Sequence, residues 1–225
     1  MLATTTLFTQ TTTALSPTCN TTTANFTLYP ITVEGTTIAE VAQRANRSIC
    51  DIGRYNLMAD VTIIPNVGQT IVIPPLECTS QPPDNESCLL PNITRTRTCI
   101  NGGPRLYYTV HGDTYEVIAR RLNITTEALM GNTSGNDASA TDLLEVGQFV
   151  KVPLCEPSSC AITPFTLTFG VYEDLAEEYG TTVGQIMMLS PTYNYSTSLM
   201  TGETRPTLDL PVNCTALADV VTVID

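Results

Sequence analysis

Three segments of the chain share one pattern of apolar and polar positions when they are displaced by 77 residues and then by a further 57. Each segment contains apolar residues at i, i+3, i+4 and i+7, the spacing of the buried face of an amphipathic helix. The three stripes are Ile38, Val41, Ala42 and Ala45; Tyr115, Ile118, Ala119 and Leu122; and Tyr172, Leu175, Ala176 and Tyr179. We expect these helices to end at Asn46, Asn123 and Gly180, since Asn and Gly favour the left-handed backbone of a helix C-terminus.

Shorter elements surround this helix in every segment. A strand with an apolar, Thr, apolar pattern precedes it at 31–33, 108–110 and 165–167. A second short helix follows, and capping residues stand near its start at Ser48, Thr125 and Thr181 or Thr182. A last strand is predicted over 67–74, 146–153 and 208–211. The pattern therefore predicts an α+β protein of three small βααβ modules, each with a two-stranded antiparallel sheet packed on two helices.

The order of these motifs resembles the LysM module. The second segment carries the most specific match, with Val110-His111-Gly112-Asp113-Thr114 and Val146-Gly147-Gln148. The eight-cysteine arrangement resembles that of fungal secreted LysM effectors with three modules. Two segments carry this resemblance, Ser48-Ile49-Cys50-Asp51-Ile52 and Cys155-Glu156-Pro157-Ser158-Ser159-Cys160. We expect a Thr-rich head at 1–27, modules at 28–75, 106–154 and 164–212, linkers at 76–105 and 155–163, and a tail at 213–225.

Eight cysteines and nine Asn-x-Ser/Thr sequons indicate an oxidising, secretory compartment. Eight cysteines allow 105 pairings, but the repeat favours a bridge that joins the two flanks of each module. The expected disulfides are Cys19–Cys78, Cys99–Cys155 and Cys160–Cys214 at the flanks, with Cys50–Cys88 between the second helix of module one and the linker. The candidate glycosylation sites are Asn20, Asn25, Asn46, Asn85, Asn92, Asn123, Asn132, Asn194 and Asn213.

The net charge of the chain restricts the kinds of molecule that it can bind. A formal net charge of −12 disfavours nucleic acid and anionic membrane surfaces, which both need clustered Lys and Arg. No run of residues approaches the ~18 apolar residues of a membrane helix. A neutral ligand fits this composition best.

Catalysis and metal binding find little support in the sequence. The densest acidic cluster is Glu173, Asp174, Glu177 and Glu178, four acids that flank an apolar stripe and that we interpret as a solvated helix face. His111 is the only histidine, and the chain has no Cys-x-x-Cys motif. We therefore expect no enzyme activity, no cofactor and no metal.

The resemblance implies that two loops of each module, one after the first strand and one before the last, form a carbohydrate-binding groove. The first-loop residues are Gly35, Thr36, Thr37 and Ile38; Gly112, Asp113, Thr114 and Tyr115; and Gly170, Val171 and Tyr172. The second-loop residues are Asp60, Val61, Thr62 and Ile63; Ala140, Thr141, Asp142 and Leu143; and Asn194, Tyr195, Ser196 and Leu199. Structural roles compete at several of them, because the glycines suit turns, the threonines suit helix caps, and Ile38, Tyr115 and Tyr172 begin the core stripes.

The resemblance also implies the ligand and the setting. Chitin oligosaccharides are neutral, and the protein would hold them outside the cell, in the apoplast or cell wall, without cutting them. It would hide such fragments from host receptors or shield hyphae from chitinases. Modules one and three can enclose one oligosaccharide together, and a shared ligand permits dimers or oligomers. The alternatives are a wall-structural or adhesion protein, a LysM immune-receptor ectodomain, and the targeting region of an enzyme.

Overall fold

The computed structural model describes residues 25–75, 83–131, 139–190 and 207–224, which form three consecutive strand–helix–helix–strand units. Unit one contains β1 (Thr27–Pro30), α1 (Ile38–Ala45), α2 (Ile49–Tyr55) and β2 (Thr70–Ile73). Unit two contains β4 (Leu106–Tyr108), α3 (Tyr115–Leu122), α4 (Thr126–Met130) and β5 (Phe149–Lys151). Unit three contains β7 (Ser158–Thr166), α5 (Tyr172–Tyr179), α6 (Val183–Leu189) and β8 (Thr207–Ala216). The first and last strands of each unit pair antiparallel, so the α+β fold class is confirmed.

The long helices begin and end at the residues that the sequence indicates. Thr37 and Thr114 cap α1 and α3, and each accepts a hydrogen bond from a backbone N–H in the first turn. The residues after the three helices adopt left-handed backbone, with φ of 52° at Asn46, 53° at Asn123 and 62° at Gly180. The second helices start after Ser48, Thr125 and Thr182. Local signals thus fix the helix boundaries.

The strands differ from the predicted positions. In unit one the first strand ends at Pro30, just before the predicted residues, and in unit two it ends at Tyr108, the first of them. Ile31 and Leu167 are almost completely buried although they follow the strands, because the chain turns inward there toward the helices. The apolar pattern therefore marks burial rather than the hydrogen-bonded ladder. The last strands of units one and two start later than predicted because Gly68 and Gly147, with φ of 94° and 89°, form turns before them.

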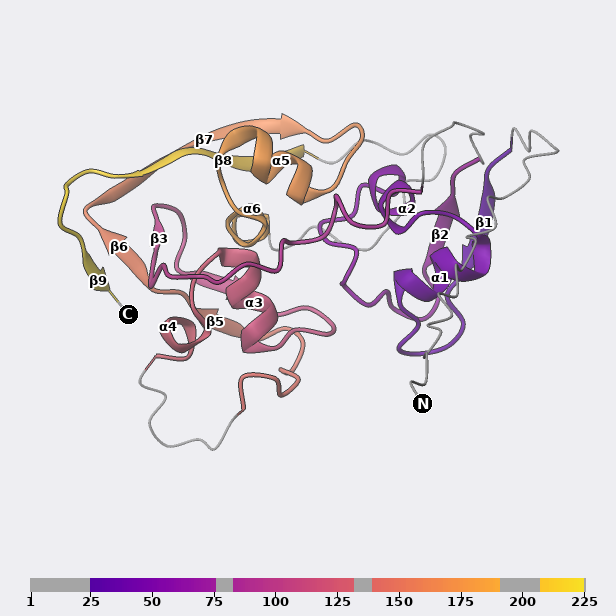
Figure 1. Cartoon of the computed structure of the whole chain (residues 1–225), viewed down its shortest axis with the longest axis horizontal. Coiled ribbons are helices and arrows are strands. Elements are labelled where there is room, and N and C mark those ends of the chain that lie inside the picture. The colour runs from indigo at the N-terminus through magenta and orange to yellow at the C-terminus, as the bar shows by residue number, and fades with distance from the viewer. Residues whose placement is uncertain (1–24, 76–82, 132–138, 191–206, 225) are drawn as a thin grey trace, which may run out of the picture.

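The expected linker at 155–163 and the expected tail at 213–225 contain regular structure. Strand β7 runs through most of that linker and pairs with β8 as far as Ser158 and Ala216. A further sheet forms from β6 (Leu154–Glu156), which pairs with β3 (Ile100–Asn101) on one side and with β9 (Thr222–Ile224) on the other. The end of the described chain therefore folds back onto unit two (Figure 1).

Three disulfides connect the positions that the repeat favours. Cys50–Cys88 joins α2 to the linker, Cys99–Cys155 lies at the edge of unit two, and Cys160–Cys214 joins β7 to β8. The fourth expected bridge, Cys19–Cys78, lies outside the described residues. A bridge contributes ~2–4 kcal/mol to a small domain, which is a large share of the stability of units this small.

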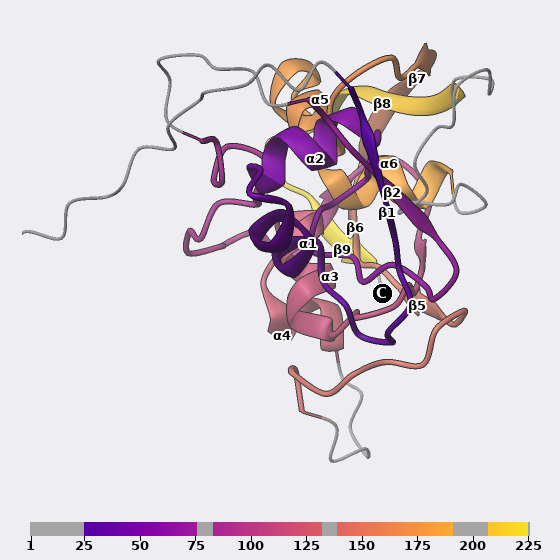
Figure 2. The same ribbon diagram turned by 90° about the vertical axis from the view of Figure 1, so that its right-hand side faces the viewer.

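The apolar core is continuous across units two and three. Ile118 and Leu122 of α3 and Ile186 and Met187 of α6 belong to one buried cluster, and Figure 1 shows α6 between α3 and the β7–β8 pair. Unit one has a core of its own, to which unit three contributes Val171. Seen from the unit-one end, its sheet and helices lie in front of the other two units (Figure 2). No helix in the described segments is long and apolar enough to cross a membrane.

The closest helix approach in this core lies at Gly184, and it yields a stability test. A Cβ atom at Gly184 would stand 2.6 Å from Leu122 Cδ2 and 3.1 Å from the carbonyl carbon of Arg121. Gly→Ala in a helix normally stabilises by ~1 kcal/mol, but we expect Gly184→Ala to destabilise by about 1–3 kcal/mol through overpacking. Urea unfolding measures the change. In a Leu122→Ala background Gly184→Ala should cost less than in the wild type, because the side chain that it clashes with is gone. An ordinary Gly→Ala gain in the wild type would contradict this packing.

Candidate ligand-binding loops

The two expected binding loops of unit two lie side by side. The N–H of Glu116 donates to the carbonyl of Ala140 at 3.0 Å, and the N–H of Leu144 donates to the carbonyl of Asp113 at 2.9 Å. These backbone bonds join the loop that starts α3 to the loop that precedes β5. In unit two the structure therefore places the residues of the two expected loops side by side.

The second loop of unit two is open to solvent. Thr141, Asp142 and Leu143 are exposed, and Leu143 exposes 76% of its surface. Gly112 of the first loop is half-buried beside Ile64 of unit one, and its φ of 91° is one at which an L side chain would be strained. The other first-loop side chains serve the fold: Asp113 is fully buried, and Thr114 caps α3. Tyr115 packs partly into the core.

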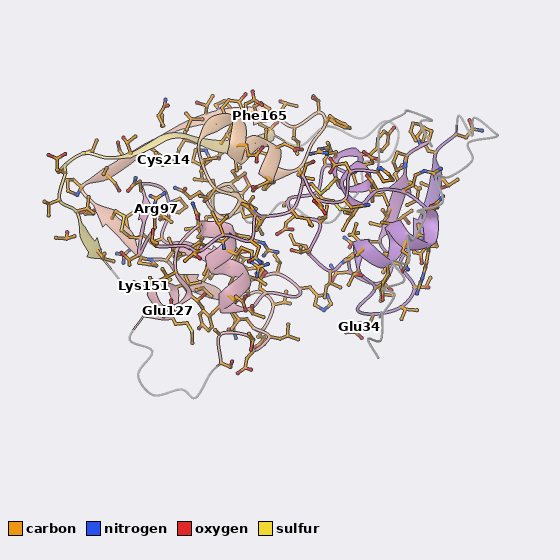
Figure 3. All side chains as sticks on the ribbon, in the orientation of Figure 1. Glu34, Arg97, Glu127, Lys151, Phe165 and Cys214 are labelled. Carbon is orange, nitrogen blue, oxygen red and sulfur yellow. A yellow bond between two sulfur atoms is a disulfide. The ribbon has the colours of Figure 1, made fainter. Side chains whose placement is uncertain are left out.

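Unit one presents a less open arrangement. Gly35 is exposed with a φ of 76°, and the neighbouring Glu34 lies at the unit-one end of the molecule, away from Lys151 of unit two (Figure 3). Thr36 is buried and donates to the carbonyl of Val33 at 2.7 Å, and Ile38 is fully buried. The remaining expected residues of unit one have different surroundings. Thr37 caps α1. In the second loop Asp60, Val61 and Ile63 are buried, whereas Thr62 is exposed.

The first loop of unit three packs against unit one. The N–H of Gly170 donates to the carbonyl of Arg54 at 3.2 Å, and the N–H of Tyr172 donates to the carbonyl of Ala59 at 3.3 Å. Val171 and Tyr172 are fully buried. The expected second-loop residues Asn194, Tyr195, Ser196 and Leu199 lie outside the described residues. In this structure the first loop of unit three therefore contacts protein instead of solvent.

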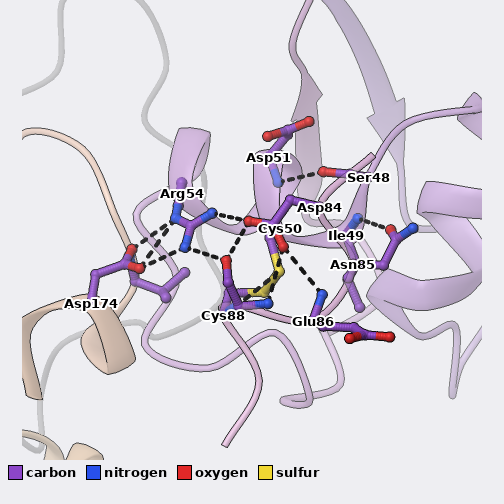
Figure 4. A network of polar contacts seen from close by, with 12 residues as sticks. Ser48, Ile49, Cys50, Asp51, Arg54, Asp84, Asn85, Glu86, Cys88 and Asp174 are labelled. Atoms are coloured by element: carbon purple, nitrogen blue, oxygen red, sulfur yellow. Dashed lines mark hydrogen bonds and ion pairs between the residues drawn. A yellow bond between two sulfur atoms is a disulfide. The ribbon is translucent and has the colours of Figure 1, made fainter. Parts of the chain in front are cut away.

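A polar network around Arg54 holds this contact together (Figure 4). The Arg54 guanidinium binds Asp174 of α5 at 2.7 Å and Asp84 of the linker at 2.7 Å. Asp174 also accepts the N–H of Val171 at 2.9 Å and so caps the first turn of α5. Partial burial opposes ionisation of Asp84, but hydrogen bonds from Ser87 and Arg54 outweigh it and hold the pKa of that carboxyl well below its usual range.

The acidic cluster on α5 is only half solvated, which corrects the sequence interpretation. Glu177 and Glu178 are exposed, whereas Asp174 is bound by Arg54 and Glu173 is 8% exposed. Burial raises the pKa of Glu173 to about 7, and the carboxylates of Glu177 and Asp60 add to the rise. The sequence could not reveal this, because the face becomes buried only through contact with unit one.

Arg121 is the residue that the sequence analysis missed. It is 1% exposed and contacts Asp60 of unit one and Asp113 of unit two, two of the expected binding residues. Burial alone would lower the pKa of Arg121, but the adjoining carboxylates and Tyr107 keep it well above its usual value. The sequence gives only a weak indication that Arg121 is buried. It lies three residues after Ile118 of the apolar stripe, but the matching residues in the other units, Arg44 and Glu178, are exposed.

The candidate sequons lie in different settings. Asn46 and Asn123 cap helices, and Asn25, Asn85, Asn92 and Asn213 are exposed. Asn20, Asn132 and Asn194 lie outside the described residues. Within the described segments no three His, Cys, Asp or Glu side chains gather as a metal site.

Unit two, with the Cys99–Cys155 disulfide at its edge and two loops side by side, has the features of a small binding module. The LysM domain family matches residues 107–153, which lie in unit two. The secreted LysM effector LysM13 of Penicillium expansum is 43% identical over 193 residues, covering 85% of this chain and 81% of that protein. The secreted LysM effector ECP6 of Passalora fulva is 35% identical over 166 residues, covering 73% and 70%. The chain belongs to the secreted LysM effectors.

Among solved structures, the ectodomain of a receptor-like kinase is 19% identical and covers 85% of this chain and 94% of that one. Its TM-score of 0.19 supports no argument about the fold.

The shifted pKa of Glu173 predicts how stability depends on pH. The folded-state pKa of about 7 exceeds the ordinary value of 4.5, so the folded protein holds a proton that the unfolded chain has lost. Stability should therefore fall as pH rises from about 4.5 to about 7 and stay level above that. We expect Glu173→Gln to stabilise by about 1–2 kcal/mol at pH 8 and by much less at pH 5.

Urea unfolding at both pH values measures this difference. Glu127→Gln, at an exposed glutamate in the first turn of α4, is the matched control and should change stability by less than ~0.5 kcal/mol. An equal effect of Glu173→Gln at pH 5 and pH 8 would show that Glu173 is not the titrating group.

Proposed function

We propose that the protein binds chitin oligosaccharides without cutting them and that unit two supplies the open binding site. The observation that supports this most is the exposed second loop of unit two, which is hydrogen-bonded to the first loop of the same unit, the unit that the LysM family matches. Units one and three share its order of elements and the left-handed residue that ends its long helix, so we propose that they are LysM modules as well. The proposed module boundaries are those expected from the repeat, with unit three extended by β7 and β8.

The chemistry of the ligand suits these loops. Each N-acetylglucosamine residue offers an amide N–H, a carbonyl and a methyl group, and carries no charge. A loop edge with accessible backbone amides and a small apolar contact can recognise all three groups. Backbone hydrogen bonds hold the first loop beside the second, and the exposed Leu143 supplies apolar surface on the second loop. Such a site also tolerates the strongly acidic net charge of the chain, because the sugar is neutral.

The acidic residues support binding rather than hydrolysis. Glycoside hydrolysis needs two carboxylates that face a shared cleft. In α5, the densest acidic segment, Asp174 is bound by Arg54 and Glu173 is buried in the contact between units. We therefore propose a non-catalytic role: the protein sequesters chitin fragments outside the cell or covers chitin in the wall. A ligand held by two chains would account for ligand-induced dimers.

Unit two should bind first. An oligosaccharide enclosed between units one and three would have to displace the hydrogen bonds from Gly170 and Tyr172 to unit one. It would also have to displace the contact between Arg54 and Asp174. The loops of unit two need no such rearrangement. We therefore assign the first binding event to unit two, and a ligand shared by units one and three to a later step.

Calorimetry with chitohexaose tests the proposal, with cellohexaose as the matched neutral sugar that lacks acetamido groups. We expect heat with chitohexaose and none with cellohexaose, in the glycosylated and the deglycosylated protein. Leu143→Asp should weaken binding about tenfold, because it removes apolar contact worth ~1.4 kcal/mol. Val220→Asp, at a residue 80% exposed outside the three units, is the control and should bind as the wild type does. Absence of heat with chitohexaose would refute the proposal.

A further inference from the structure

One buried side chain connects a binding loop of unit one to a binding loop of unit two. Arg121 of α3 donates from Nε to Asp60 Oδ2 at 2.7 Å and from a terminal nitrogen to Asp113. The same terminal nitrogen reaches the Tyr107 hydroxyl at 2.8 Å, and the other lies 3.4 Å from Thr62 Oγ1. Arg121 and Asp113 are at most 1% exposed and Asp60 is 5% exposed. The cluster is therefore shielded from water and salt.

Each of the two carboxylates also shapes its own loop. Asp60 Oδ1 accepts the N–H and the hydroxyl of Thr62, both at 2.8 Å, which closes a tight turn in the second loop of unit one. Asp113 Oδ2 accepts the N–H of Val110 at 2.8 Å, which closes a turn in the first loop of unit two. In both residues one oxygen folds the loop and the other binds Arg121. The guanidinium thus holds the two loop conformations at a fixed separation.

The loops also contact each other directly. The N–H of Ile64 approaches the carbonyl of His111 at 3.5 Å, and a Cβ atom at Gly112 would stand 3.3 Å from Ile64 Cδ1. A shift of the 60–64 loop would therefore press on the backbone of the 111–113 loop.

We propose that Arg121 is a positioning residue that couples these two loops, so that a change in the unit-one loop alters sugar binding at unit two. The proposal rests on the proposed function. Its physical basis is the planar fork of the guanidinium, which binds two carboxylates in a fixed geometry that a lysine ammonium cannot reproduce. An ion cluster that only stabilised the fold would leave the affinity of unit two unchanged by a mild substitution in unit one.

The charge of the cluster suggests such a mild substitution. One guanidinium faces two carboxylates, so the buried cluster carries a net charge of −1 when all three groups are ionised. Asp60→Asn keeps the side-chain oxygen that Thr62 needs and leaves a balanced pair of Arg121 and Asp113. This variant should fold, whereas Arg121→Met would leave two carboxylates buried without a partner.

Two measurements on Asp60→Asn test the coupling. Without ligand, hydrogen exchange should quicken at the amides of 110–114 in unit two as well as at 60–64 in unit one. Chitohexaose affinity at unit two, by calorimetry, should fall about fivefold to tenfold. Asp113→Asn, which leaves Arg121 paired with Asp60, should have a similar effect. Arg121→Lys should also weaken binding.

The control is Arg120→Met, at the neighbouring residue of the same helix, which pairs only with Glu116 in the structure; it should bind as the wild type does. Folded Asp60→Asn with unchanged exchange at 110–114 and affinity within twofold of the wild type would overturn the proposal. If the wild type itself does not bind chitohexaose, the proposed function fails, and the exchange measurement alone decides whether Arg121 couples the loops.

Discussion

A strand–helix–helix–strand unit of fewer than 50 residues buries little apolar surface, and its stability is marginal. Contacts outside its own elements therefore matter to every unit of this chain. Units two and three merge their cores across α3 and α6, where Gly184 permits close contact. Unit one is joined to the linker by Cys50–Cys88 and takes Val171 of unit three into its core. The need to bury apolar surface thus determines how the units are arranged.

This arrangement in turn determines which loops face solvent. The loops at the end of each unit are natural contact surfaces, because their backbone amides have no partners within the helices. Unit three uses its first loop against unit one, through the N–H groups of Gly170 and Tyr172. Unit one has its second loop largely buried between its neighbours. Of the two second loops that the structure describes, the one in unit two is the more accessible, so three similar units need not give three equivalent sites.

The sequence predicts what is local and misses what arises between units. Helix ends at Asn46, Asn123 and Gly180 and caps at Thr37 and Thr114 follow from residue types in the correct order, and the spacing of the cysteines leads to three of the observed bridges. The roles of Arg121 and Glu173 could not be predicted in this way. Arg121 matches the exposed Arg44 and Glu178 in the repeat, so only the proximity of Asp60, 61 residues earlier, explains its burial. Likewise, pairing with β8 extends β7 through residues whose composition is typical of a linker.

Two arginines connect unit one to the other units, and their surroundings differ in a way that matters for ligand access. Arg54 is 18% exposed, and its partners Asp84 and Asp174 are about one-third exposed, so water can replace these bonds at small cost and salt weakens them. Arg121 is shielded from water, and separating it from its carboxylates would leave buried charges without partners. The Arg54 ion pairs therefore hold units one and three together less firmly than Arg121 holds units one and two. The buried Val171 side chain in the unit-one core adds an apolar contact that a ligand entering between units one and three would also have to displace.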